Sequence, residues 1–552
     1  MGFALLCAAV LIYWGLQYHP FVLPNNDYYS FERTARSFSA FELPRSFKRM
    51  PILPALMALL APLLPGPHPY LDAALIWNQV FSLAVLAGLF LLGHRLLGRS
   101  GLLLPVLFAG TTQFHANGLQ PLVEPSLGFF SVWAFLLHAW RSPWKYAAAA
   151  GAALSRYEAA LLIPVLFAAD VLEQRRLWRP LLPAGLASSG LLVWAGLGAL
   201  HGSGGASYYD LMSGMGFQPA PGFFLRSLKE PFAGWYTSHW VWMIPFVGVV
   251  GLPLLAGIGS GLREDRREVG PMLAFGLGCV ATIVAFGINK ARYVYPTEWI
   301  WLLLWLVGAV RMGRWIERRL LRSVGAWAWG VAGLCGLLSL VALGFWLAKM
   351  ASEPQTAPRG LELAYLFVLL GLAGVALWPP RREGRAPAAG AALASALFLA
   401  TLPLLAGGIV GKQRAVHKIY HANWSAHLLA DWLRENLRPD DRVALLPRSP
   451  VLHLTGLPSS RLVAYAQLDA HDLDSLIAAF RRRGITLAVY TDRGPLRNPS
   501  HHYYYREKKT YLAELFESGG PVPGFEHLAT LPLPASIQRK PVQIYRLREI
   551  SR

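Results

Sequence analysis

Apolar stretches of about 20 residues recur along the first three quarters of the chain, and short polar turns separate them. A helix of that length crosses the hydrocarbon core of a bilayer, so each stretch predicts a membrane-spanning segment. The chain is therefore predicted to be a polytopic α-helical membrane protein. The expected spans are roughly 2–18, 71–93, 101–115, 120–140, 180–200, 240–261, 270–288, 297–311, 324–347, 361–378 and 388–411.

The stretch 146–172 does not fit this pattern, because it is too short for two full spans of about 20 residues each. Basic turns flank both of its ends, and a polar break at 155–158 interrupts it. We expect two short helices that fold back at this break. Polar backbone at that depth must be buried in protein or line a cavity. Counting the pair as two brings the total to about 13 segments.

Basic residues gather in six of the turns between spans, which the positive-inside rule places on the cytoplasmic side. We then expect a cytoplasmic N-terminus, a long first outer loop at 19–70, and location in the cytoplasmic (inner) membrane. Residues 2–18 lack a basic leading region and a cleavage site, so they are expected to be a retained span. The basic turns are 94–99, 141–145, 175–179, 263–267, 311–322 and 381–385.

From about residue 415 the pattern changes to short β-rich runs and amphipathic helices. We predict a transmembrane domain at 1–414 and a small extracytoplasmic α/β domain at 415–552. Its expected helices are 421–436 and 472–484, and its expected strands lie in 442–447, 461–466, 485–492 and 542–548.

The net charge of +20 does not point to nucleic acid, because the basic residues lie in turns between spans. There they set topology and contact membrane lipids. Cys7, Cys279 and Cys335 all lie in apolar stretches, so neither a disulfide framework nor a metal framework is indicated.

The stretch 25–54 carries too many charges to cross a bilayer and is expected to lie in water against the membrane. Asp27 precedes an amphipathic helix expected at 28–41, and a second amphipathic segment, 50–64, begins near Pro51. The carboxylate could cap the first helix or act in chemistry. Arg45, Lys48 and Arg49 could contact lipid headgroups or bind a phosphate.

Other ionisable residues lie at the outer ends of spans or at the polar break. Glu124, at the start of a span, should face a cavity or act as a helix cap. Arg156 and Glu158 could close the break as an ion pair or contact substrate. Lys290 and Arg292 could extend toward the membrane surface or contact a phosphate.

Together these residues resemble, in order, the motifs of the GT-C superfamily of integral-membrane glycosyltransferases. The resemblance is to bacterial protein mannosyltransferase-like and aminoarabinose-transferase-like enzymes, and it covers about residues 1–310. The segments that carry it are Asn26-Asp27-Tyr28-Tyr29, Arg49 to Pro54, Gln120 to Pro125, Ser155 to Glu158, and Lys290 to Pro296.

The resemblance implies transfer of a sugar, with inversion, from a polyprenyl-phosphate donor to a glycan, lipid or protein acceptor on the outer face. It implies that Asp27 is the general base and that Glu124 orients the acceptor or a metal ion. No metal ligand is assigned, since many relatives carry a second acidic residue beside the base and this chain has Asn26 and Tyr28. Which cofactor is used stays open. The expected substrate-binding residues are Asn26, Tyr28, Arg45, Lys48, Arg49, Arg156, Glu158, Lys290, Arg292 and Tyr293.

Two other functions fit a polytopic chain. A transporter or flippase of a lipid-linked or small polar substrate would place charges at mid-membrane, often in two matched halves, but the break at 155–158 has no obvious partner in the second half. A non-catalytic membrane scaffold would need neither Asp27 nor Arg292.

Overall fold

A computed structural model shows the arrangement of the chain. It describes residues 1–17, 27–66, 68–201, 230–232, 246–285, 291–319, 325–352, 359–377, 388–445, 448–491, 511–533 and 540–548. By their contacts the residues form two units, Met1–Tyr18 with Ser30–His417, and His19–Tyr29 with Lys418–Arg552. The first unit is helical, and the second contains the only sheet among the described residues.

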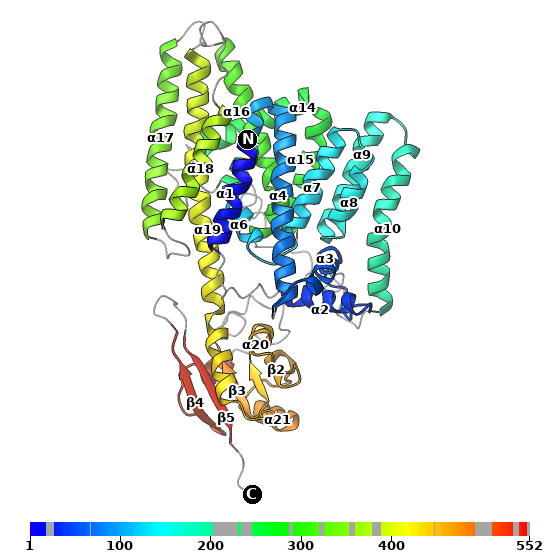
Figure 1. Ribbon diagram of the computed structural model, residues 1–552, viewed down its shortest axis with the longest axis vertical. Helices are drawn as coiled ribbons and strands as arrows, with labels where there is room; N and C mark the ends of the chain where they lie inside the picture. Colours follow the sequence, from blue (N-terminus) through cyan, green and yellow to red (C-terminus); the bar gives the residue numbers. More distant parts are fainter. Residues whose placement is uncertain are drawn as a thin grey trace. The chain divides into compact units, whose positions relative to one another are not determined.

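The helical unit is a bundle of apolar helices (Figure 1). Seven helical segments in the described part of the chain are long and apolar enough to cross a membrane, and shorter apolar helices accompany them. A polytopic membrane protein is confirmed, while the count of about 13 segments stays a prediction. The helices are α1 (Gly2–Gln17), α2 (Tyr28–Ser39), α3 (Ile52–Leu60), α4 (Pro69–Leu97), α5 (Leu103–Ala109), α6 (Thr112–Gly118), α7 (Glu124–Ala139), α8 (Lys145–Ala153), α9 (Leu162–Gln174), α10 (Trp178–His201), α14 (Leu252–Glu264), α15 (Arg266–Ala285), α16 (Tyr295–Arg319), α17 (Gly325–Ser352), α18 (Arg359–Leu377) and α19 (Ala388–Asn436).

The prediction of one span at 101–115 is wrong. The chain turns at Gly98, whose φ of +60° favours glycine, and short α5 and α6 follow. A Cβ on Gly101 would lie 2.2 Å from the backbone carbon of Gly93, so the two backbones touch and α5 packs back against α4.

The C-terminal end of the bundle differs as well. The predicted span 388–411 and helix 421–436 form one continuous helix, α19.

The predicted break at 155–158 is present. Helix α8 ends at Ala153, a 3₁₀ turn η3 (Tyr157–Leu161) follows, and α9 packs against α8.

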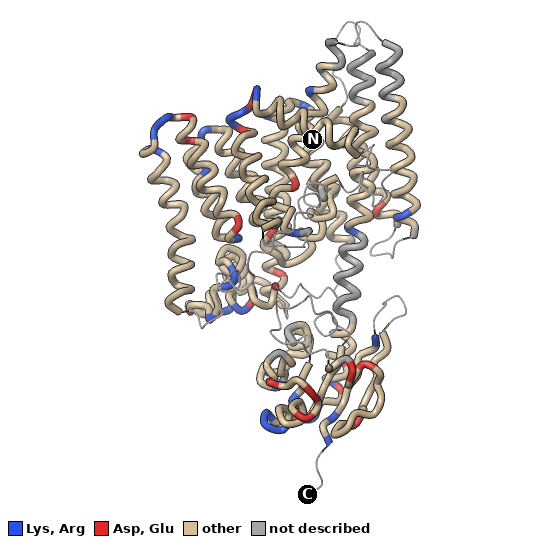
Figure 2. Tube along the Cα trace, turned by 180° about the vertical axis from the view of Figure 1, so that it is seen from behind, with Lys and Arg blue, Asp and Glu red and all other residues tan. Residues whose placement is uncertain are grey.

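Ion pairs also show that several basic turns lie at one end of the bundle, where Figure 2 shows Lys and Arg gathered. The pairs are Arg95–Glu268 at 3.2 Å, Arg141–Glu173 at 3.4 Å and Arg267–Glu173 at 2.9 Å. This matches the expected grouping of the turns on one side; which side of the membrane that is stays a prediction.

Helices α1, α18 and α19 are joined by a fully buried ion pair. The Lys412 ammonium donates to Glu362 Oε1 at 2.9 Å and to the Tyr13 hydroxyl at 2.7 Å. Neither charged side chain is exposed. A single charge inside the bilayer costs about 2.5–3.5 kcal/mol on insertion scales, so each of the two charges stabilises the insertion of the other.

Helix α16 is the centre of the unit, and three of its tryptophans, Trp299, Trp301 and Trp305, are fully buried. It packs closely on α14 because glycines let the backbones meet. A Cβ on Gly257 would lie 1.8 Å from the Leu304 carbonyl oxygen. Small residues at such crossings let the helices pack closely, and this packing holds them together in lipid, where the hydrophobic effect between helices is weak.

The terminal unit holds a five-stranded sheet in the order β2-β1-β3-β5-β4, in which β1 is parallel to β2 and β3, and β5 is antiparallel to β3 and β4. Side chains alternate along β1: Val443 and Leu445 pack under α19 and α20, and Ala444 packs under α21. The sequence did not predict β4, α20 or α23. The elements are β1 (Val443–Leu445), α20 (Arg448–Thr455), β2 (Leu462–Ala464), α21 (Leu473–Arg483), β3 (Leu487–Tyr490), α23 (Tyr511–Phe516), β4 (Phe525–Leu531) and β5 (Val542–Leu547).

The contact between α14 and α16 gives a direct test of the packing. We expect Gly257→Ala to lower stability by about 1–3 kcal/mol, the usual cost of overpacking. Gly259→Ala on the same helix is the matched control, because nothing lies within 4 Å of its added Cβ. Thermal unfolding of both variants in detergent measures the difference. Equal stability of the two would contradict the close approach of α14 and α16.

Candidate active site

The helix break places Arg156 next to the start of α7. The Ser155 hydroxyl donates to the Gly151 carbonyl at 2.9 Å, and Ser126 Oγ of α7 donates to Ser155 Oγ at 3.3 Å. Arg156 is extended, with φ −153° and ψ 142°, and η3 begins after it. The serines therefore fix the point at which the chain leaves α8, and the arginine side chain leaves the helix there.

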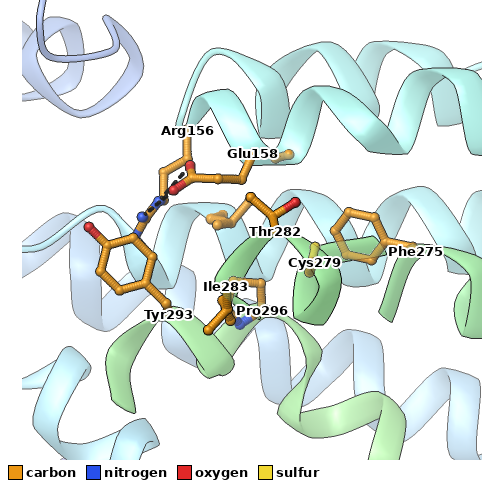
Figure 3. Close-up of a pocket in the computed structure, with 10 residues that line it drawn as sticks. Arg156, Glu158, Phe275, Cys279, Thr282, Ile283, Tyr293 and Pro296 are labelled. Carbon is orange, nitrogen blue, oxygen red and sulfur yellow. Dashed lines mark hydrogen bonds and ion pairs between the residues drawn. The ribbon is translucent and has the colours of Figure 1, made fainter. Parts of the chain in front are cut away.

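Arg156 binds two carboxylates at once. Its Nη1 donates to Glu124 Oε1 at 2.8 Å, while its Nη2 and Nε donate to the two oxygens of Glu158 at 2.7 and 3.2 Å. Figure 3 shows the Arg156–Glu158 pair beside the pocket. The exposed fractions of the Arg156 and Glu124 side chains are 11% and 2%. The structure thus shows the ion pair predicted at the break, and the pair extends to Glu124. Contact of these residues with substrate stays a prediction.

A second arginine reaches the same carboxylate. Arg292, in the 3₁₀ turn η7 (Ala291–Val294), has its Nε 3.6 Å from Glu124 Oε1. Tyr293 lies with its ring centroid 4.2 Å from the Arg156 guanidinium carbon and 5.6 Å from that of Arg292. The negative face of an aromatic ring attracts cations, so Tyr293 helps to keep two positive groups close together.

The four ionisable groups form a balanced set of two guanidiniums and two carboxylates. Glu124 Oε2 is buried and has no hydrogen-bond partner among the described residues. A buried polar atom without a partner is costly unless a ligand or water satisfies it. The arrangement can bind an anion if the arginines turn toward it, and Glu124 Oε2 can accept a hydrogen bond from a hydroxyl group.

A pocket opens beside these charges, with about 360 Å³ of empty space that includes open solvent. Arg156, Glu158 and Tyr293 form its polar side (Figure 3). The sequence interpretation missed the other side, although Phe275, Cys279, Thr282 and Ile283 recur at the three- and four-residue spacing of one helix face. The apolar and small lining residues are Leu127, Ala159, Phe275, Cys279, Thr282, Ile283 and Pro296.

The segment with the predicted cations 45–49 lies next to the break. The Tyr157 hydroxyl donates to the Phe47 carbonyl at 3.2 Å, and the Ile52 amide donates to the Leu154 carbonyl at 3.3 Å. Phe47 is buried among hydrophobic residues that include Leu154 and Tyr157. The backbone that carries Arg45, Lys48 and Arg49 is thus held against the segment that carries Arg156.

Four predicted residues are still to be described: Asn26, Asp27, Tyr28 and Lys290. Asn26 and Lys290 are outside the described residues. Asp27 and Tyr28 belong to the terminal unit; Asp27 is half-buried and directly precedes α2, the position of a helix cap. Among the described residues no group of three or more His, Cys, Asp or Glu side chains is placed to hold a metal ion.

The sequence matches no protein-family model, and a search of curated proteins finds no match. The fold is similar to two solved structures of ArnT from Cupriavidus metallidurans, one bound to undecaprenyl phosphate and one in the apo state. Each has a TM-score of 0.55 and 14% identity, with 98% of this chain and 97% of that chain covered. An oligosaccharyltransferase from Archaeoglobus fulgidus matches with a TM-score of 0.49 and 10% identity, over 98% of this chain and 74% of that chain. The likeness shows that this chain has the fold seen in ArnT, over nearly the full length of both chains.

The ion-pair cluster predicts a coupling between Arg156 and Glu124. Arg156→Met should cost about 3–5 kcal/mol of stability, because it leaves a buried carboxylate poorly compensated. The double variant Arg156→Met with Glu124→Gln should recover part of this loss, since the buried charge is gone. Thermal unfolding of wild type, both single variants and the double variant gives the coupling energy. Additive effects would contradict a direct buried pair.

Proposed function

We propose that this protein is an inverting glycosyltransferase that moves a sugar from a polyprenyl-phosphate donor to a glycan, lipid or protein acceptor on the outer face of the cytoplasmic membrane. One observation carries the proposal: two arginines from separate segments surround one buried carboxylate beside a partly apolar pocket. The fold is that of ArnT, which was solved bound to undecaprenyl phosphate. A lipid monophosphate has the charge and the apolar chain that such a site suits.

The donor phosphate is assigned to Arg292 and Arg156, with Lys290 as a further cation from the motif. Guanidinium groups bind phosphate through paired hydrogen bonds and stay charged in partly buried sites. The Arg292 Nε lies 3.6 Å from Glu124 Oε1 and the Arg156 Nη1 lies 2.8 Å from the same oxygen, so both guanidiniums adjoin one carboxylate. Arg45, Lys48 and Arg49 are assigned to the same phosphate, because the backbone that carries them contacts the break.

The pocket wall on α15 suits the carbon chain next to the phosphate. Phe275 and Ile283 offer apolar surface, and the smaller side chains Cys279 and Thr282 line the pocket beside them. Ligand sites are commonly apolar with a few placed polar groups that fix orientation. Arg156 and Tyr293 supply that polar end in this pocket.

Asp27 is proposed as the general base. Displacement at the anomeric carbon requires removal of the acceptor proton as positive charge develops on the sugar, and a placed carboxylate contributes typically about 10²–10⁴-fold to the rate. The leaving group is a phosphate, which needs neighbouring cations more than an acid. Glu124 is assigned to acceptor orientation through its buried Oε2. Single displacement from the opposite face gives inversion.

The transporter alternative gains no specific support from the structure. The ionisable residues of the site meet in one cluster around Glu124, rather than in two matched halves. The similarity to ArnT covers nearly the whole chain, including the terminal domain.

The role of Asp27 is tested by Asp27→Asn, which keeps the size of the side chain and removes its basicity. We expect this variant to insert and fold normally but to lose at least about 10²-fold in turnover. Glu32→Gln in α2 is the matched control, because Glu32 pairs with Arg36 on its own helix. Transfer from a panel of radiolabelled undecaprenyl-phosphate sugars in proteoliposomes measures both. Turnover by Asp27→Asn at the wild-type rate would refute the assignment.

The phosphate role of Arg292 is tested by binding. Arg292→Ala should weaken the binding of undecaprenyl phosphate by about 10–100-fold. A hydrogen bond to a charged group contributes about 1.5–3 kcal/mol, and the variant removes it. Arg36→Ala is the control, since Arg36 is exposed and pairs within α2. Native mass spectrometry of the protein with added undecaprenyl phosphate gives the affinities. Equal weakening in both variants would indicate a general surface-charge effect and not a site.

A further inference from the structure

The terminal α/β domain forms one contact-defined unit with the start of the first outer loop. Residues His19–Tyr29 group by their contacts with Lys418–Arg552. Asp27, Tyr28 and Tyr29 are the described part of that short segment. The loop residues that carry the proposed base are thus anchored to the α/β domain.

The anchor is a cluster of three rings. The Tyr28 and Tyr29 rings lie 6.1 and 5.7 Å from the His453 ring, at interplanar angles of 86° and 67°. The two tyrosine rings lie 5.4 Å from each other at 68°. Each pair has the edge-to-face geometry that aromatic rings favour. The exposed fractions of Tyr28 and Tyr29 are 0% and 7%, so the cluster is a buried contact.

His453 is well placed to hold these rings because its helix is fixed to the sheet. Val451 of α20 is fully buried in a core formed with α19, β1 and β2. His453 is two residues further along, about 200° around the helix axis, and so lies on the face turned away from that core. The Thr455 hydroxyl donates to the Val451 carbonyl at 2.7 Å and secures the end of the helix.

We propose that His453 is a positioning residue for the reaction: through Tyr28 and Tyr29 it fixes the backbone of the proposed base, Asp27. This rests on the proposed function, and it gives the terminal domain a task within it. Tyr28 directly follows Asp27 in the chain. When the Tyr28 ring loses its contact with His453, the backbone that carries the Asp27 carboxylate is less firmly held. A displacement of about 1 Å in a reacting group can cost about 10²-fold in rate.

Removal of the His453 ring is expected to affect turnover and donor affinity differently. The proposal gives the two kinds of residue separate roles: the arginines beside Glu124 hold the donor phosphate, and the His453 ring holds the loop of the base. Loss of the ring should therefore lower kcat and leave donor affinity unchanged. A ring of similar size should preserve the anchor, because the contact is made by ring edges and faces.

The test uses the full-length protein in proteoliposomes, with radiolabelled undecaprenyl-phosphate sugars for turnover and undecaprenyl phosphate itself for affinity. His453→Ala should lower kcat by about 10–100-fold and leave undecaprenyl phosphate affinity within twofold of wild type. His453→Phe should keep most of the turnover. His471→Ala is the matched control, because this histidine of the same domain is exposed and pairs with Asp469; its turnover should equal that of wild type.

A second readout does not depend on catalysis. Hydrogen–deuterium exchange of the peptide 27–39 should rise in His453→Ala and stay at the wild-type level in His453→Phe and His471→Ala. Unchanged exchange and turnover in His453→Ala would overturn the inference, as would an equal loss of kcat and donor affinity. If Asp27→Asn keeps full turnover while His453→Ala raises exchange, the proposed base is wrong and the anchoring of the loop stands.

Discussion

One buried guanidinium holds the helical unit's candidate site together. Arg156 lies at the break between α8 and α9, where it binds Glu158 on its own segment and Glu124 at the start of α7. A charge in this environment is tolerated only with a partner, because desolvation costs several kcal/mol per ion. The pairing therefore ties the helix break to α7 and, through Glu124, to Arg292 in η7. The break, the start of α7 and η7 are far apart in sequence, and these ion pairs hold them together.

The same requirement bears on the proposal that this cluster binds a charged ligand. Two arginines and two carboxylates leave the cluster without net charge, which lowers the cost of burying these groups in a low-dielectric setting. An incoming phosphate supplies negative charge that can take over contacts from Glu124. Beside the charges, α15 provides an apolar wall. A ligand with a phosphate at one end and a hydrocarbon chain at the other satisfies both halves of this surface.

Much of the fold could be predicted because the bilayer imposes simple rules on sequence. Hydropathy located α4, α7, α10 and α15, and the charge at the ends of 146–172 predicted the break that bears Arg156. The turn at Gly98 escaped prediction, since it depends on a backbone contact between Gly93 and Gly101 that only tertiary packing reveals. Helix periodicity could not show that α19 continues without interruption, because both of its halves read as helices.

The site was predicted in its residues more than in its contacts. Glu124, Arg156, Glu158 and Arg292 were all identified from charge at span ends, where ionisable groups are costly without a function or partner. The Arg156–Glu158 pair was one of the two predicted readings of the break. The contacts of Glu124 with the arginines were not predicted, because Arg156 and Glu124 are 32 residues apart and meet only through helix packing. The ring contact of His453 with Tyr28 and Tyr29 likewise joins segments over 400 positions apart, and no local signal marks it.

The most direct test of the central claim is an experimental structure of the full-length protein with undecaprenyl phosphate in a lipid nanodisc. The account predicts phosphate density in contact with the Arg292 and Arg156 guanidiniums, with the first carbons of the chain against Phe275 and Ile283. Phosphate bound away from both arginines, with the Arg156–Glu124 pair unchanged, would contradict it.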